Sequence, residues 1–151
     1  MKYMRGRKHP KVRNNTMEKL FKLEIVTPDK CFLKEEVSMV VVNTKMGKVG
    51  VLKNHAPMVF AVTPGEIKIR KNDEDRKAFV SEGFMEVNNN VVILMVDAAE
   101  WPEEIDVNRA LQAKQRAEER LRRKLAEKEY INSKAALLRA IERINITKKS
   151  N

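Results

Sequence analysis

A single cysteine, Cys31, and only two histidines occur in the 151-residue sequence. One cysteine cannot form an internal disulfide, and no Cys/His cluster has the spacing of metal ligands, so neither a disulfide framework nor a structural metal is expected. No apolar run approaches the roughly 18 residues of a membrane span, and the N-terminus lacks the apolar core of a secretory signal. These absences predict a soluble, cytoplasmic protein.

Signatures of catalysis are also missing. The sequence has no Gly-rich phosphate loop, no Ser/His/Asp arrangement with supporting context, and no pair of acids resembling that of a glycosidase. His55 lies beside a predicted turn, where a lone histidine is more often a hydrogen-bonding or interface residue than a catalyst. A hydrolytic pair made of Glu100 and Asp106 stays open as an enzymatic alternative.

The net charge of +10 is distributed unevenly along the chain. Residues 1–16 carry six Lys or Arg and no acid, residues 17–102 carry 12 basic and 13 acidic side chains, and residues 103–151 carry 13 basic and 8 acidic ones. Residues 1–16 have almost no apolar content to bury, so we expect a basic disordered extension, and Met17 could itself begin the folded domain.

Residues 17–101 show the period of two that is typical of half-buried strands. Turn residues divide this part of the chain into short pieces, and Gly47 and Gly50 are expected to bracket a tight reversal. The segments that we expect to be extended are 21–25, 37–43, 67–70, 78–81, 84–87 and 91–96. Many short strands at close spacing predict an antiparallel β-sandwich.

The composition changes at Pro102, because all five glycines and all five prolines lie at or before it. Beyond it Ala, Leu, Glu, Lys and Arg dominate, which are the strongest helix formers. Asp106 is the expected N-cap of the first helix, and Glu-Arg pairs at i,i+4 are expected from Glu118 and Glu119. Residues 102–151 are therefore predicted to form an antiparallel helical hairpin, broken near 127–132. The expected stripes are Val107, Ala110 or Leu111, Lys114, Ala117, Leu121 and Leu125 in one helix and Leu137, Ile141 and Ile144, with Ala136 and Ala140 beside them, in the other.

Arginines recur at helical spacing in this hairpin and propose a binding site. A solvated basic face is the commoner explanation of such spacing, and Asp106 with Arg109 could be no more than a cap with an exposed ion pair, which contributes about 1 kcal/mol or less. However, guanidinium groups suit phosphate oxygens and cannot lose their charge. If the helices fold back on one another, we expect the following groups to converge on an anion: Glu100, Asp106, Arg109, Arg116, Arg139 and Arg143.

Nucleic acid is the second candidate partner of the basic tail. Against it, Tyr130 is the only aromatic residue beyond Trp101, so a stacking platform is missing, and acids are interleaved throughout. An acidic protein surface is the better target for such a mixed helix. A steep fall of nucleic-acid affinity with salt would distinguish a nucleic-acid binder.

Several short sequences, taken together, resemble the epsilon subunit of bacterial F-type ATP synthase. Each is weak alone, but their order and spacing are specific, and the match covers Met17 to about Lys149. In chain order they are Val26-Thr27-Pro28-Asp29, Gly47-Lys48-Val49-Gly50-Val51-Leu52 with His55-Ala56-Pro57, Gly65, Gly83-Phe84-Met85-Glu86-Val87, and Ile105-Asp106-Val107-Asn108-Arg109-Ala110.

The resemblance implies an α+β protein, with a β-sandwich of about ten strands docked on the gamma subunit and the membrane rotor ring. It implies a non-catalytic subunit of a proton- or sodium-translocating synthase, peripheral on the cytoplasmic face of the bacterial plasma membrane and associated with it only through the complex. No cofactor is required, no nucleic acid is bound, and ATP is a regulatory ligand. The ATP ligands that the resemblance implies are Glu100, Ile105, Asp106, Arg109, Ala110, Arg116, Arg139 and Arg143.

The implied mechanism is a conformational switch that restrains ATP hydrolysis. ATP clamps the hairpin in a compact form, and at low ATP the helices extend along gamma toward the catalytic alpha and beta subunits. Residues 1–16 fall outside the family pattern, and Lys48 stands at a turn position where relatives often carry an acid. The interface residues that follow from the resemblance are Lys48, His55, Pro57, Arg122, Arg123 and Lys124.

Overall fold

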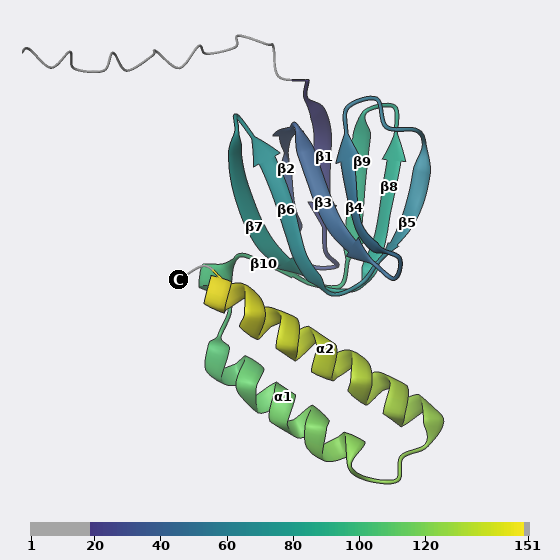
Figure 1. Ribbon diagram of the computed structural model, residues 1–151, viewed down its shortest axis with the longest axis vertical. Helices are drawn as coiled ribbons and strands as arrows, with labels where there is room; N and C mark the ends of the chain where they lie inside the picture. The colour runs from purple at the N-terminus through teal and green to yellow at the C-terminus, as the bar shows by residue number, and fades with distance from the viewer. Residues whose placement is uncertain (1–18, 150–151) are drawn as a thin grey trace, which may run out of the picture.

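The computed structural model describes residues 19–149, so the extension predicted for residues 1–16 lies outside the described residues. Two layers of strands form a sandwich, and a pair of helices packs across one end of it (Figure 1). The chain therefore has the α+β fold that the sequence predicts, with strands first and a helical hairpin last. Within the described part of the chain, no helix is long and apolar enough to cross a membrane.

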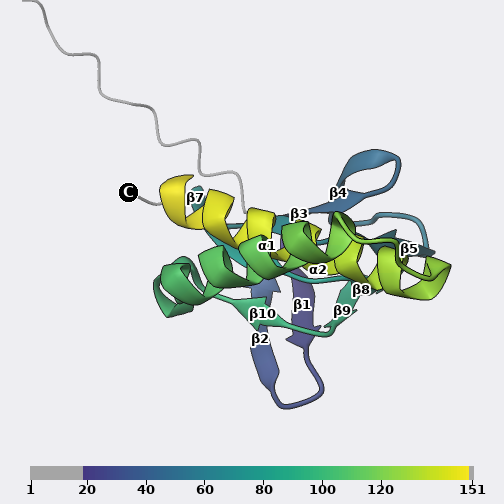
Figure 2. The same cartoon turned by 90° about the horizontal axis from the view of Figure 1, so that it is seen from below.

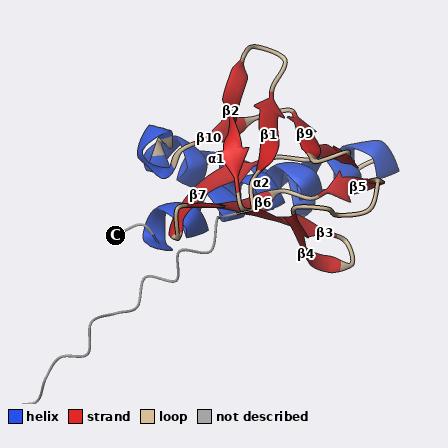
Figure 3. Cartoon of the chain, turned by 90° about the horizontal axis from the view of Figure 1, so that it is seen from above, coloured by secondary structure: helices blue, strands red, loops and turns tan. Residues whose placement is uncertain are grey.

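Ten strands divide equally between the two sheets, which are drawn from above in Figure 3. One sheet has the order β2-β1-β9-β8-β5 and the other the order β10-β7-β6-β3-β4. Neighbouring strands run antiparallel, except that β1 and β9 run parallel. The strands are β1 Phe21–Val26, β2 Cys31–Val37, β3 Met39–Thr44, β4 Gly47–Leu52, β5 Met58–Val62, β6 Gly65–Lys71, β7 Glu74–Val80, β8 Gly83–Asn88, β9 Val91–Val96 and β10 Ala99–Glu100.

The core between the sheets follows from the predicted alternation. Phe21, Leu23 and Ile25 of β1 face inward and are buried, while Lys22 between them is exposed. Ile67 and Ile69 repeat the pattern in the opposite sheet. Burial of such side chains is the main favourable term in folding, at about 1.5–3 kcal/mol for each large one.

The extended segment predicted for residues 37–43 is in fact parts of two strands. β2 ends at Val37 and β3 begins at Met39, and the chain turns between them at Ser38. There the backbone N–H of Ser38 donates to the carbonyl of Arg70 at 2.8 Å, and the Ser38 hydroxyl donates to the same oxygen at 3.1 Å. A polar side chain that satisfies a backbone acceptor thus fixes the corner, which period-two alternation does not reveal.

The tight reversal expected between Gly47 and Gly50 is also wrong. Both glycines belong to β4, and the turn is at Lys45 and Met46, just before it. Gly47, the first residue of β4, has a φ of +111°. That conformation favours glycine because an L side chain is strained there. Gly50 pairs with Val41 of β3 within the regular ladder.

The helices are α1 (Val107–Leu121) and α2 (Glu127–Lys149), and a short 3-10 helix, η1 (Pro102–Glu104), precedes them. They pack antiparallel, and α2 lies against the sandwich, as Figures 1 and 2 show from two directions. The break falls at residues 122–126, earlier than predicted, and within the described chain the pairs expected from Glu118 and Glu119 are absent because α1 ends at Leu121.

Alanines make the contact between the two helices. Ala110, Ala117 and Ala140 are buried, whereas Val107 and Leu111 of the predicted stripe are 40% and 47% exposed. Small side chains let the helices approach closely, so the buried stripe is narrower than the sequence pattern suggests. Where α2 meets the sandwich, a separate buried cluster consists of Phe79, Ile105 and Ile146.

Candidate functional site

A pocket of about 370 Å³ lies between η1, the facing sides of α1 and α2, and the last strand of the sandwich. Glu104, Ala113, Ala136 and Ala140 also line it, none of which was a candidate from the sequence. The structure brings together all eight candidate ligand residues, which are Glu100, Ile105, Asp106, Arg109, Ala110, Arg116, Arg139 and Arg143. Glu100 in β10 and Arg143 in α2 are 43 positions apart in the sequence, and they meet because the hairpin packs against the sandwich.

Two carboxylates fix the backbone where the sandwich joins α1. Asp106 is the N-cap of α1, as predicted, and its Oδ1 accepts the backbone N–H of Arg109 at 3.0 Å. Glu104 Oε2 accepts the backbone N–H of Trp101 at 3.0 Å, which holds η1 in place. A cap of this kind stabilises a helix by about 1 kcal/mol. Asp106 and Glu104 thus position the mouth of the pocket through hydrogen bonds to the main chain.

Arg143 is held by three contacts. Its Nε and Nη2 donate to the two carboxylate oxygens of Glu100, at 3.0 and 3.3 Å. Its guanidinium also lies over the Phe79 ring, 4.4 Å from the centroid. A two-bond pair with ring stacking is the most specific arrangement an arginine can make, so α2 is anchored firmly to β10 and β7 here.

Arg139, one turn earlier on α2, has a different partner. Its Nη1 donates to Glu82 Oε1 at 2.6 Å. Glu82 was not a candidate from the sequence, because its partner is 57 residues away and no spacing rule connects them. Glu82 lies in the turn before β8, at the end of the sandwich that faces α2. Its pairing with Arg139 could be predicted only once the order of the strands and the position of α2 are known.

Arg109 and Arg116 of α1 remain without such partners. Within residues 19–149, no carboxylate oxygen lies within 4.0 Å of either guanidinium. The pocket thus contains four guanidinium groups against the three carboxylates of Glu100, Glu104 and Asp106. Because Arg109 and Arg116 have no carboxylate within 4.0 Å among residues 19–149 and the alanine walls leave the space open, the pocket offers two guanidinium groups and the volume for an anion.

The enzymatic alternative does not fit these contacts. Asp106 is engaged as a helix cap and Glu100 in a two-bond ion pair, so neither carboxylate is placed as an unengaged base. General-base catalysis requires a group within hydrogen-bond reach of the proton it takes.

The candidate interface residues lie on three other parts of the surface. Lys48 is exposed in β4, and His55 and Pro57 lie in the connection between β4 and β5. The His55 ring contacts the Phe60 ring edge-on, with 6.0 Å between centroids, as a structural or interface histidine would. The other three, Arg122, Arg123 and Lys124, are exposed in the connection between α1 and α2. This connection is at the far end of the hairpin from the start of α1 and the end of α2 (Figure 1).

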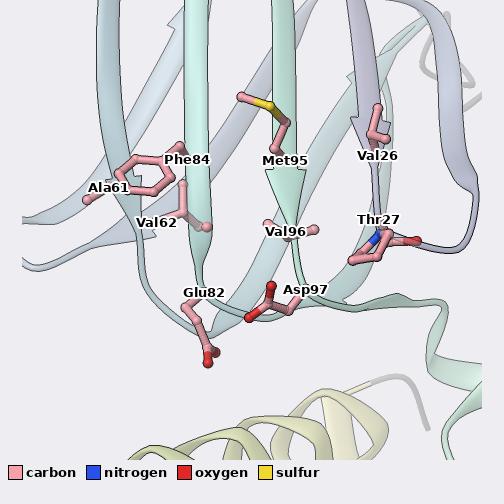
Figure 4. A pocket seen from close by; sticks show the side chains of 11 residues that line it. Val26, Thr27, Ala61, Val62, Glu82, Phe84, Met95, Val96 and Asp97 are labelled. Carbon is pink, nitrogen blue, oxygen red and sulfur yellow. The ribbon is translucent and has the colours of Figure 1, made fainter.

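An apolar hollow of about 630 Å³ lies on the outer face of the β2-β1-β9-β8-β5 sheet, and Figure 4 shows it closely. Phe84 and Met95 line it and are 57% and 47% exposed, and Val59 of the adjacent strand β5, which pairs with Glu86 on the same face, is 66% exposed. Contiguous exposed apolar side chains of this kind mark a surface that another protein covers. Sequence analysis missed it, because no strand was predicted at residues 58–62 and alternation alone does not show which outward side chains lie together.

Comparisons with known proteins agree with this architecture along the whole described chain. Residues 20–102 match the family described as ATP synthase, Delta/Epsilon chain, beta-sandwich domain, and residues 103–148 match the one described as ATP synthase, Delta/Epsilon chain, long alpha-helix domain. The ATP synthase epsilon chain of Caldanaerobacter subterraneus subsp. tengcongensis is 45% identical over 134 residues, covering 88% of this chain and 97% of that protein.

Further relatives extend the comparison. The epsilon chain of Alkaliphilus metalliredigens is 47% identical over 132 residues, covering 87% of this chain and 98% of that protein. A chain in the Euglena gracilis mitochondrial ATP synthase structure, described as OSCP/F1/c-ring, shares the fold with a TM-score of 0.72 at 23% identity, covering 91% of this chain and 84% of that one. These matches confirm the resemblance: the chain belongs to the ATP synthase epsilon chain family, whose members are non-catalytic subunits of the central stalk.

Proposed function

We propose that this chain is an ATP-responsive rotor subunit, which couples the gamma subunit to the membrane rotor ring and restrains ATP hydrolysis through its hairpin. The observation that carries the nucleotide part is the convergence of four arginines on one pocket between α1 and α2. Arg109 and Arg116, which have no carboxylate partner within residues 19–149, are the groups best placed to receive phosphate oxygens. Ile105 and Ala110 supply apolar contacts for the base or ribose.

The pocket belongs to the docked hairpin, because its walls come from both helices and from β10. A ligand that binds there has affinity only for the docked form, and each tenfold difference in affinity shifts the equilibrium by about 1.4 kcal/mol. Repulsion between Arg109 and Arg116, which have no carboxylate within 4.0 Å among residues 19–149, favours opening when ATP is scarce. The opened hairpin would present Arg122, Arg123 and Lys124 to acidic surfaces on the catalytic alpha and beta subunits and so block rotation.

The apolar outer face around Phe84 and Met95 is the part of the sandwich best suited to the gamma subunit. Lys48 is exposed in β4 near the β3–β4 turn, and His55 and Pro57 lie in the connection after β4; we place contacts with the membrane rotor ring at these residues. In this arrangement the chain lies on the cytoplasmic face of the bacterial plasma membrane and reaches it only through the complex. Solved complexes that contain a chain of similar fold include the c-ring, with F1 in the Euglena gracilis complex and with the central stalk in the Tetrahymena thermophila complex, which is consistent with that place.

Titration calorimetry with ATP tests the nucleotide site. The wild-type chain should bind one ATP, and Arg109→Ala should weaken binding at least tenfold, because it removes a charge-assisted hydrogen bond to phosphate. Arg123→Ala is the matched control, since Arg123 is an exposed arginine that does not line the pocket. Equal affinities for all three chains would remove the assignment.

A further inference from the structure

Glu82 presents its carboxylate to α2 from a rigid turn between β7 and β8. The backbone carbonyl of Glu82 accepts the N–H of Asp97 at 3.2 Å, and the hydroxyl of the preceding Ser81 accepts the N–H of Ala98 at 2.7 Å. The turn is therefore tied to the end of β9 on both sides. Figure 4 shows the Glu82 side chain leaving the apolar hollow and pointing toward the helix below.

The ion pair that Glu82 makes with Arg139 is only half satisfied. One carboxylate oxygen accepts from Arg139, whereas Oε2 is buried and has no hydrogen-bond partner within residues 19–149. By contrast, both oxygens of Glu100 are engaged by Arg143. The Glu82 side chain is 41% exposed and one charge-assisted hydrogen bond joins it to Arg139, so the Glu82 pair is the weaker of the two attachments of α2. Of the two arginines, Arg139 is the one that can change partner.

We propose that Glu82 competes with the anionic groups of the ligand for the guanidinium of Arg139. In the empty pocket its carboxylate holds Arg139, and a phosphate group that enters the pocket takes the guanidinium over. Arg139 already lines the pocket, and a phosphate offers the paired oxygens that a guanidinium fork accommodates. The ligand gains this arginine only by displacing Glu82, so Glu82 raises the ATP concentration at which the hairpin responds. The inference rests on the proposed nucleotide site and identifies a residue that sets its affinity.

Calorimetry with ATP on the full chain tests the competition. Glu82→Gln keeps the shape of the side chain and removes its charge, so ATP should bind about fivefold more tightly than to the wild type. Glu86→Gln is the matched control. Glu86 is exposed in β8, the strand that follows Glu82, and it makes no ion pair within residues 19–149. Its affinity should equal that of the wild type.

A double-mutant cycle distinguishes the competition from a general charge effect. If the gain comes from releasing Arg139, Glu82→Gln should change the ATP affinity less than twofold when Arg139→Ala is already present. A fivefold gain that persists without Arg139 would show that the charge of Glu82 acts at a distance, and would overturn the proposal. Glu82→Ala, which removes the carboxylate without leaving an amide, should give the same direction of change and serves if Glu82→Gln does not fold.

Amide hydrogen exchange of α2 at saturating ATP tests whether Glu82 only attaches the helix to the sandwich. If Glu82 serves only to attach the helix, Glu82→Gln should speed exchange in α2 and weaken ATP binding, which would overturn the competitor role. Unchanged affinity in Glu82→Gln, in a wild-type chain that binds ATP and loses it with Arg109→Ala, would overturn this inference alone. An absence of ATP binding by both the wild type and Glu82→Gln would overturn the proposed function together with it.

Discussion

Replacing Arg143 by alanine should loosen the attachment of α2 to the sandwich even without nucleotide. The side chain is 25% exposed and Glu100 30%, so their two-bond pair lies between a surface and a buried one and contributes about 1 kcal/mol. The contact with the Phe79 ring adds about 1 kcal/mol. A total of about 2 kcal/mol corresponds to a change of about thirtyfold in the equilibrium between docked and undocked α2.

Amide hydrogen exchange in α2, measured without ATP, is the suitable assay. Most helical stability in proteins comes from tertiary packing, so an undocked α2 frays and its amides exchange faster. Arg143→Lys keeps the charge but loses the planar fork, and should fall between the wild type and Arg143→Ala. Arg123→Ala should leave exchange unchanged. A change of less than threefold in Arg143→Ala would refute the reasoning that these contacts anchor the helix.

Three further predictions concern local features of the fold. Asp106→Ala should lower the free energy of unfolding of α1 by about 1 kcal/mol, measured as faster exchange in its first turn, and an unchanged rate would count against the cap. Gly83→Ala should lower the urea midpoint markedly, because a Cβ would overlap a backbone carbonyl of β9, and a wild-type midpoint would show that β8 can shift. Hydrogen bonds from Arg70, and then from Lys68, hold the pKa of Asp75 well below its usual range. This stabilisation is complete above the unfolded pKa of about 4 and is lost as pH falls through the lower folded pKa. Asp75→Asn should therefore make the free energy of unfolding less dependent on pH on the acid side. Parallel curves of that free energy against pH for the wild type and Asp75→Asn would contradict the pairing.

Local chemistry explains what could be predicted from the sequence. Asp106 marks the start of α1 because an N-cap needs only its own helix, and the core of β1 follows from the alternation of its side chains. The arginines of the pocket were predictable as a set because helical spacing and an antiparallel hairpin are enough to bring them together. Both kinds of inference use relations within a few residues or within one simple motif.

Tertiary structure decides what the sequence analysis missed. β2 combines three charged residues with apolar ones in no clean alternation, and β5 is a short apolar run at the edge of its sheet, so neither shows the period of an ordinary half-buried strand. The pair of Glu82 with Arg139 depends on which turn of the sandwich faces α2. The break of the hairpin was placed too late because residues 122–126 contain neither glycine nor proline to mark it.

The most direct test of a nucleotide-dependent hairpin is a distance measured across the molecule as ATP is added. Cys31 is the only cysteine of the chain and is exposed in β2, and Lys124→Cys adds a second labelling position in the connection between the helices. Spin labels on the two sites report how far the hairpin tip lies from the sandwich. With saturating ATP we expect one short distance, whereas without ATP, or with ATP and Arg109→Ala, we expect a second, longer distance to appear beside the short one. A single distribution at every ATP concentration would contradict the account.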